Sequence, residues 1–240
     1  IACNQACLDH AFKNKRVSCL VNPRACHETE LVYIKTQKAK RIAVVGAGPA
    51  GLSAATVAAE RGHHVTLFDA SSEVGGQFNI AKQIPGKEEF YETIRYFQKQ
   101  LELTGVTLKL DTPVTAGMLN NSEFDEVIVA TGITPRTPEI SGIDHPKVLN
   151  YLDVIRDKKA VGGKVAVIGA GGIGFDVSEY LSHGSVSTSQ NIPAFMAQWG
   201  IDMTLKARSG IEGVTQQFAA LAERHLHQLN QQRQRQRRRL

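Results

Sequence analysis

Cysteines gather at the start of the sequence, where Cys3, Cys7 and Cys19 have the spacing C-x3-C-x11-C. Thiolate sites that hold a metal ion or an iron–sulfur cluster usually use four ligands. Cys26 is a fourth thiol, so a structural zinc site made of all four cysteines is one interpretation, although these gaps match no common zinc spacing. The other interpretation is that the sequence belongs to a longer chain, which supplies a further cluster ligand.

A glycine pattern typical of dinucleotide sites lies in RIAVVGAGPAGLSAATVAAERGHHVTLFDA, residues 41–70. The apolar run at residues 42–45 predicts a buried strand, and a stretch with closely spaced apolar residues then predicts a helix that stops at Gly62. A second strand is expected at residues 65–68. Strand, glycine loop, helix and strand in this order predict a βαβ unit of Rossmann type.

The chemistry of this first fingerprint follows from its residue types. Gly46 permits a tight turn, Gly48 lets a pyrophosphate approach the backbone, and Gly51 lets helix and strand pack closely. The free N–H groups and the dipole at the start of the helix favour phosphate. Asp69, at the end of the second strand, is expected to accept hydrogen bonds from ribose hydroxyls.

The same pattern returns in GKVAVIGAGGIGFDVSEYL, residues 163–181. A strand is expected at residues 165–168, and Gly169, Gly171 and Gly174 take the three glycine positions, with Gly172 and Ile173 between them. Two such patterns in one chain predict two bound nucleotides. The predicted fold class is therefore α/β, a Rossmann-like two-dinucleotide-binding flavoprotein fold.

An apolar strand at residues 126–130 separates the two patterns and ends in Thr131-Gly132. A strand that ends in glycine beside a nucleotide allows the backbone to approach the ligand closely. The same stretch also fits an ordinary core strand followed by a turn.

Composition limits the function classes. The chain has 240 residues, 42% of them hydrophobic, which is enough for one large domain or two small ones. No run of about 18 apolar residues predicts a membrane span, and no secretory signal is visible. Four cysteines without a secretory signal favour a cytoplasmic protein with thiols or thiolate ligands.

The sequence resembles one family closely from Ile1 to about Thr215. IACNQAC, SCLVNPRACHE, GGQFNIAKQIPGKEEFYET and STSQNI, together with the two glycine patterns, are similar to the bacterial NADPH-dependent 2,4-dienoyl-CoA reductases. That group includes trimethylamine dehydrogenase and 2-enoate reductase. The resemblance implies an amino-terminal FMN-binding barrel outside this sequence, a 4Fe–4S cluster, and FAD and NADPH domains, the NADPH domain being nested in the FAD domain.

The resemblance also assigns residues. The family's cluster ligands follow C-x2-C-x3-C-x11-C; Cys3, Cys7 and Cys19 match the last three, and the first would stand immediately before Ile1. It implies FAD contacts at Ala50, Asp69, Gln77, Lys87 and Val114. Gly76 leaves backbone exposed near a phosphate or the flavin edge. No catalytic residue is assigned, because the substrate site would belong to the barrel.

These expectations divide the chain into four segments: 1–37, the cluster segment and linker; 38–155, the FAD domain; 156–215, a partial NAD(P) domain; and 216–240, a basic low-complexity tail. The implied function is electron relay from NADPH through FAD and the cluster to FMN, which reduces an enoyl-CoA bound by the barrel in unsaturated fatty acid β-oxidation. The alternatives are a stand-alone NAD(P)H-dependent flavin oxidoreductase and an inactive nucleotide-binding fragment.

The tail departs from the family pattern. Residues 216–240 carry six arginines and one glutamate, which account for the net charge of +5, while the other 22 basic and 22 acidic residues cancel. A frame change or disrupted gene, a basic arm that binds nucleic acid without sequence preference, and an exposed partner-binding helix are the three interpretations. The first is favoured because the change falls inside an expected domain.

Overall fold

The structure is a computed structural model that describes residues 6–120, 123–183, 187–207 and 210–211. Cys3 and the basic tail, for which nucleic-acid binding is one of three interpretations, lie outside the described residues. The chain divides into a unit of residues 1–182 and a unit of residues 183–240. No helix within the described ranges combines the length and the apolar character that a bilayer span requires.

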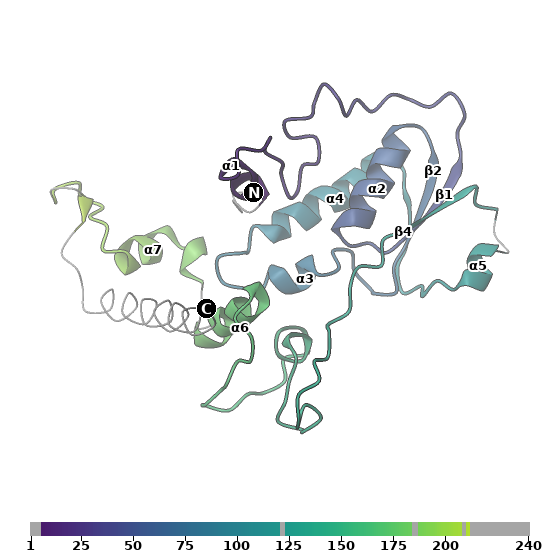
Figure 1. Cartoon of the computed structure of the whole chain (residues 1–240). Coiled ribbons are helices and arrows are strands. Elements are labelled where there is room, and N and C mark those ends of the chain that lie inside the picture. Colours follow the sequence, from purple (N-terminus) through teal and green to yellow (C-terminus); the bar gives the residue numbers. More distant parts are fainter. Residues whose placement is uncertain (1–5, 121–122, 184–186, 208–209, 212–240) are drawn as a thin grey trace. The chain divides into compact units, whose positions relative to one another are not determined.

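A four-stranded parallel sheet forms the centre of the first unit (Figure 1). Its strands are β1 (Arg41–Val45), β2 (His64–Phe68), β3 (Thr107–Lys109) and β4 (Glu126–Val129), in the order β3-β2-β1-β4. The three strands predicted before the second glycine pattern are thus confirmed. The central strand β1 is an uninterrupted apolar run after its first residue, as expected for a parallel strand that is buried on both faces.

Two helices lie side by side along the sheet, α2 (Pro49–Glu60) and α4 (Phe90–Thr104) (Figure 1). Pro49 suits the first turn of α2, where its missing N–H costs no hydrogen bond. Gly105, at φ 73°, ends α4 in the left-handed conformation. The buried side chains of these helices and of the strands form one apolar core, which comprises Ile42, Val44, Ala47, Leu52, Ala55, Val65, Leu67, Val74, Ile94, Phe97 and Leu101.

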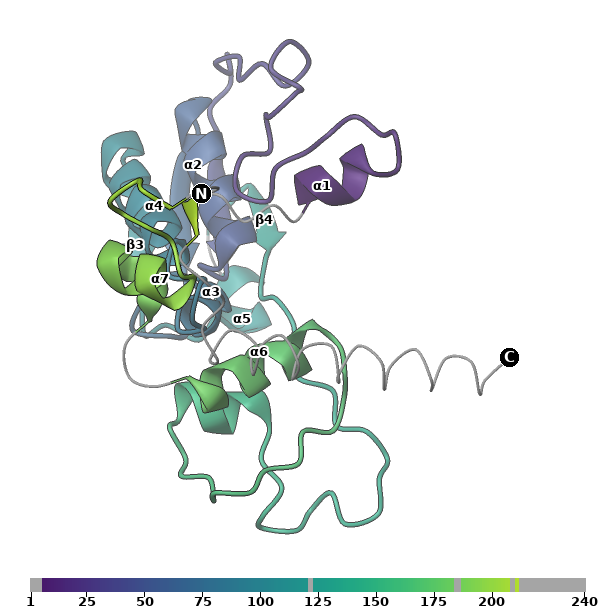
Figure 2. The ribbon, with the colours of Figure 1, turned by 90° about the vertical axis from the view of Figure 1, so that its left-hand side faces the viewer.

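A second, smaller apolar cluster joins three short elements of the same unit: α3 (Phe78–Ala81), a helical turn at Leu152–Arg156 and α6 (Gly172–Ser182). The α6 helix lies farther from α2 than α3 does (Figure 2). The buried members of this cluster are Ile84, Val154 and Ile155, and side chains of α3 and α6 pack against them. The cluster therefore docks α6 onto the part of the chain that follows the first fingerprint.

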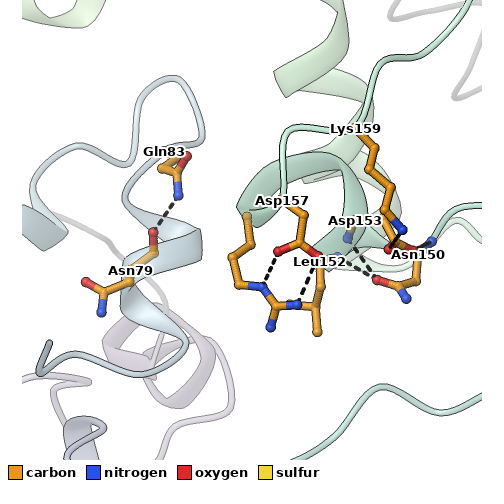
Figure 3. A network of polar contacts seen from close by, with 8 residues as sticks. Asn79, Gln83, Asn150, Leu152, Asp153, Asp157 and Lys159 are labelled. Atoms are coloured by element: carbon orange, nitrogen blue, oxygen red, sulfur yellow. Dashed lines mark hydrogen bonds and ion pairs between the residues drawn. The ribbon is translucent and has the colours of Figure 1, made fainter. Parts of the chain in front are cut away.

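The turn at Leu152–Arg156 is fixed by a reciprocal cap (Figure 3). Asn150 Oδ1 accepts from the backbone N–H groups of Leu152 and Asp153, at 2.8 and 3.1 Å. The Asp153 carboxylate accepts from the Asn150 N–H at 2.9 Å and from Lys159 Nζ at 2.6 Å. The pKa of Asp153 is lowered, first by the Lys159 hydrogen bond and then by the Asn150 N–H.

The strand predicted at residues 165–168 is wrong: within the described residues this segment belongs to no strand or helix. Val165, Val167 and Ile168 are 50%, 41% and 79% exposed. A parallel strand exists only when a neighbour accepts and donates its backbone hydrogen bonds, and no described segment lies beside this one as a partner strand. The apolar run has a high strand propensity, but propensity alone does not form a strand without a partner for its backbone hydrogen bonds.

The remaining described helices of the first unit are α1 (Ala6–Ala11) and α5 (Ala116–Asn120). The second unit contains a 3-10 turn at Thr188–Gln190 and α7 (Ile192–Gln198). Its Asp202 is buried and accepts from the Thr204 hydroxyl and from three backbone N–H groups. The Thr204 hydroxyl first, and then the backbone N–H groups, lower the pKa of Asp202 to about 2, so this loop is held by a carboxylate that stays ionised.

Candidate functional site

The first glycine loop follows β1 directly and has the shape that its sequence predicts. Gly46 has φ 107°, and a Cβ there would lie 2.3 Å from the Ala130 carbonyl oxygen. A Cβ on Gly51 would lie 1.7 Å from the Gly46 carbonyl oxygen. Both positions therefore exclude any side chain, because real Cβ atoms do not approach backbone atoms so closely. The turn and the close helix packing predicted for these two glycines are confirmed.

Asp69 connects the end of β2 to this loop. One carboxylate oxygen accepts from the Ala47 N–H at 2.6 Å and the other from the Ser71 N–H at 2.8 Å. These two bonds fix the carboxylate beside the glycine loop. Each carboxylate oxygen has a further lone pair, so Asp69 can still accept hydrogen bonds from a ribose.

The Gly-Gly-Gln segment lies against the same loop. The Gly75 N–H donates to the Ala47 carbonyl at 2.8 Å, and a Cβ on Gly76 would lie 3.0 Å from the Gly48 Cα. Gln77 accepts a hydrogen bond from the Tyr151 hydroxyl at 3.2 Å. Two glycine backbones thus face each other without side chains between them, which is the kind of cradle that a phosphate or flavin edge needs.

Thr131 and Gly132 follow β4 on the other side of the loop. The Ala130 N–H donates to the Val45 carbonyl at 2.8 Å, which continues the sheet as far as this segment. Gly132 has φ 75°, and both it and Thr131 are exposed. The structure therefore brings together, at the carboxyl edge of the sheet, most of the residues predicted for FAD: Gly46, Gly48, Gly51, Asp69, Gly76, Thr131 and Gly132. This edge is where ligands bind in open α/β sheets.

The other predicted FAD contacts lie in three further segments. Ala50 is exposed in the first turn of α2. Val114 is half-buried after β3, in a segment whose Thr112 N–H donates to the Asp69 carbonyl at 2.8 Å. Lys87 places its ammonium group on Asp176, with Nζ 2.6 and 2.7 Å from the two carboxylate oxygens. Contacts of these three residues with FAD stay predictions.

The second glycine pattern repeats the local geometry of the first at the start of α6. Gly169 has φ 121°, and a Cβ on Gly174 would lie 2.2 Å from the Gly169 carbonyl oxygen. Gly171 and Gly172 have open space where a Cβ would stand, and Ile173 is 53% exposed. A turn able to expose helix N–H groups to a phosphate therefore exists here without the preceding strand.

The cysteine segment packs beside the first fingerprint. Leu20 and Val21, which follow Cys19, line a cavity of about 280 Å³ together with Pro49 and Ala50 at the start of α2. Cys7 and Cys19 are half-buried free thiols. Among the residues that the structure describes, no three His, Cys, Asp or Glu side chains are grouped to hold a metal.

Cys26 is exposed and has φ 63°, an uncommon conformation for a residue with a side chain. Beyond it, the Glu30 carboxylate accepts from His27 and Arg16. The pKa of Glu30 is lowered, first by the hydrogen bond to His27 and then by that to Arg16. This exposed network is of the kind that orders a surface loop, and it contributes little stability.

Two residues of the site were missed by the sequence analysis. Tyr151 contacts Gln77 and Asp176 contacts Lys87, in each case across more than 70 positions of the chain. The one available signal was Asp176 itself, a carboxylate in the first turns of the fingerprint helix, between the apolar residues Phe175 and Val177. Such a residue needs a partner when the helix is docked.

The comparisons agree with this geometry. Residues 40–230 match the family model described as pyridine nucleotide-disulphide oxidoreductase. A metal reductase of Desulforamulus reducens is 35% identical over 202 residues, which are 82% of this chain and 30% of that protein. A cinnamate reductase of Clostridium sporogenes is 37% identical over 184 residues, which are 75% of this chain and 27% of that protein.

A solved structure of 2-naphthoyl-CoA reductase in complex with 2-naphthoyl-CoA superimposes with a TM-score of 0.71 at 38% identity. The match covers 75% of this chain and 28% of that one. The chain thus spans less than a third of the length of each of these relatives. The predicted Rossmann-like α/β class, with folds of the FAD- and NAD(P)-binding kind, is confirmed. This chain belongs to the pyridine nucleotide-disulphide oxidoreductase family.

Proposed function

We propose that the chain binds FAD at the first glycine loop and NADPH at the second, and that it supports hydride transfer from NADPH to FAD. The observation that carries this proposal is the cradle at the carboxyl edge of the sheet, where Gly48 and Gly76 approach each other and Asp69 is fixed beside them. The second glycine turn and the family membership support the nicotinamide half.

Different residues would bind different parts of the two cofactors. The start of α2 offers N–H groups and the positive end of its dipole to the FAD phosphates, and Asp69 offers acceptors to the ribose. The backbone of Gly76 offers a close approach, and Gly172 at the start of α6 offers N–H groups to the NADPH phosphates. When bound, the flavin would accept a hydride, and the chain contributes only binding and orientation.

The test is an anaerobic absorption spectrum of the purified full chain, before and after addition of NADPH. We expect a flavin spectrum that bleaches with NADPH. A flavin spectrum that does not bleach would leave the FAD site standing and overturn the NADPH half of the proposal. A colourless protein that takes up no added FAD would overturn both halves.

We further propose that the natural role of this chain is the FAD- and NADPH-binding part of an enzyme that reduces an enoyl-CoA, in the manner of the 2,4-dienoyl-CoA reductases. The sequence resemblance and the likeness to 2-naphthoyl-CoA reductase support the substrate class. FMN and the substrate would bind to a barrel outside this sequence. The chain spans less than a third of the length of its relatives, which is consistent with a separate FMN- and substrate-binding part.

A 4Fe–4S cluster at Cys3, Cys7 and Cys19 is a separate proposal. It is supported by the cysteine spacing, which matches three of the four ligands of the family pattern and lacks the first. Iron and acid-labile sulfide in anaerobically reconstituted protein would support it, with Cys7→Ser and Cys19→Ser lowering both. Stoichiometric zinc without sulfide would support the zinc interpretation instead.

A further inference from the structure

The position of the second glycine turn depends on how α6 is held. Residues 161–170 before it have no regular structure in the described part of the chain, and most of them are exposed. The turn at Gly169–Gly174 is therefore attached to the rest of the first unit mainly through α6, which begins at Gly172. Whatever docks α6 also sets where the phosphates of a nucleotide bound to this turn would lie.

The apolar part of this docking lacks direction. Val177, Tyr180 and Leu181 of α6 pack against Ile84 and Ile155. Apolar contacts stabilise by removing area from water, and they depend less on direction than hydrogen bonds do, so a small cluster tolerates a slight shift of the helix more readily than a hydrogen-bonded pair does. A directional contact therefore specifies the register of α6 more tightly than this cluster alone.

Two polar contacts on one face of α6 provide that direction. Asp176 and Tyr180 are four residues apart, so they lie on the same face of the helix. Asp176 receives the Lys87 ammonium on both oxygens, at 2.6 and 2.7 Å, and Tyr180 receives Lys158 Nζ at 2.8 Å. Lys158 also donates to Gln83.

The Lys87–Asp176 pair is the contact nearest to the glycine turn, because Asp176 stands two residues after Gly174. Both side chains are 30% exposed, so the pair is partly shielded from water. The Lys87 ammonium group contacts both carboxylate oxygens of Asp176. Lys87 belongs to the segment that begins at Gly75, which hydrogen-bonds the first glycine loop through Ala47. The ion pair thus joins α6, which carries the second glycine turn, to the segment that hydrogen-bonds the first glycine loop.

We infer that Lys87 and Asp176 form a positioning pair, which fixes the register of the NADPH-binding turn relative to the FAD-binding loop. The inference rests on the proposed function and adds to it a residue pair that acts through α6 and touches no reacting atom. Hydride transfer requires the donor and acceptor carbons at close range, and a displacement of about 1 Å can cost about a hundredfold in rate. Loosening α6 should therefore slow the transfer more than it weakens binding.

The experiment uses the full chain with Lys87→Met, Asp176→Asn and the double variant Lys87→Asp/Asp176→Lys. Lys40→Met is the matched control, since it breaks an ion pair with the same N–O distance, 2.6 Å, to Glu126 at the amino edge of the sheet. Stopped-flow reduction of bound FAD by NADPH gives the rate at saturation and the NADPH dissociation constant. Amide hydrogen exchange on FAD-free protein reports on α6 independently of activity.

We expect Lys87→Met and Asp176→Asn each to lower the saturating rate about tenfold, and we expect Asp176→Asn to keep the wild-type FAD content. Exchange should become faster at residues 172–177, and the double variant should restore both readouts. The control should change neither. Unchanged exchange and rate in the Asp176→Asn variant would overturn the inference.

Two other outcomes distinguish failure of the positioning role from failure of the proposed function. If Lys87→Met lowers FAD affinity while Asp176→Asn has no effect, Lys87 is a flavin ligand and the positioning role is wrong. If wild-type protein binds no FAD or is not reduced by NADPH, the proposed function fails. The exchange data on FAD-free protein then still decide whether the pair holds α6, and unchanged exchange would reject the pair on its own.

Discussion

Gly51 shows at the scale of one residue how strictly the first loop limits its side chains. Its missing Cβ would meet the Gly46 carbonyl oxygen at 1.7 Å, and that oxygen belongs to backbone that cannot rotate away. Asp69 and Ala47 are tied to the same loop by a 2.6 Å hydrogen bond. A methyl group at position 51 therefore has to displace the loop that would hold the phosphates.

We predict that Gly51→Ala lowers the free energy of unfolding by about 1–3 kcal/mol and lowers FAD affinity at least about tenfold. Urea unfolding and titration with FAD measure the two effects. Gly163→Ala is the matched control, because a Cβ at Gly163 meets nothing within 4 Å. Equal behaviour of the two variants would show that the tight contact at Gly51 has no energetic consequence.

At the scale of elements, the two glycine patterns differ in what precedes them. β1 pairs with β2 and β4 on its two sides, whereas residues 164–168 pair with no strand in the described part of the chain. Helix α6 nevertheless forms after the turn, because a helix satisfies its own backbone hydrogen bonds and a strand does not.

This contrast predicts that amides at residues 164–168 exchange with solvent at nearly unprotected rates, while those of Ile42–Val45 are strongly protected. Hydrogen exchange followed by mass spectrometry of peptides from the two segments measures both. The two apolar runs have similar composition, so each serves as the control for the other. Strong protection at residues 164–168 would mean that this segment has a strand partner.

At the scale of the whole molecule, the chain covers less than a third of its relatives and holds nucleotide-binding elements. We predict that the purified chain, free of host reductases, does not reduce a 2,4-dienoyl-CoA with NADPH, because the FMN and the substrate are proposed to bind to a barrel outside this sequence. Chromatography of the CoA esters after incubation measures this. Product formation in proportion to the chain's concentration would contradict the prediction.

The sequence by itself determined the class of the fold and most of the first site. The first glycine pattern can be interpreted from the sequence because its geometry depends on single residues. Gly46 adopts positive φ and Gly51 lacks a Cβ, and both are properties of glycine itself. The sequence predicts exposed backbone at Gly76, but it does not predict that Gly76 approaches Gly48.

Tertiary structure alone decided the pairing of distant residues. The Lys87–Asp176 ion pair was not predicted, and the strand expected at residues 165–168 did not form. An ion pair between residues 89 positions apart leaves no periodic trace in the sequence. A strand, in turn, depends on neighbours that its own residues do not encode, because its hydrogen bonds are completed by another segment of chain.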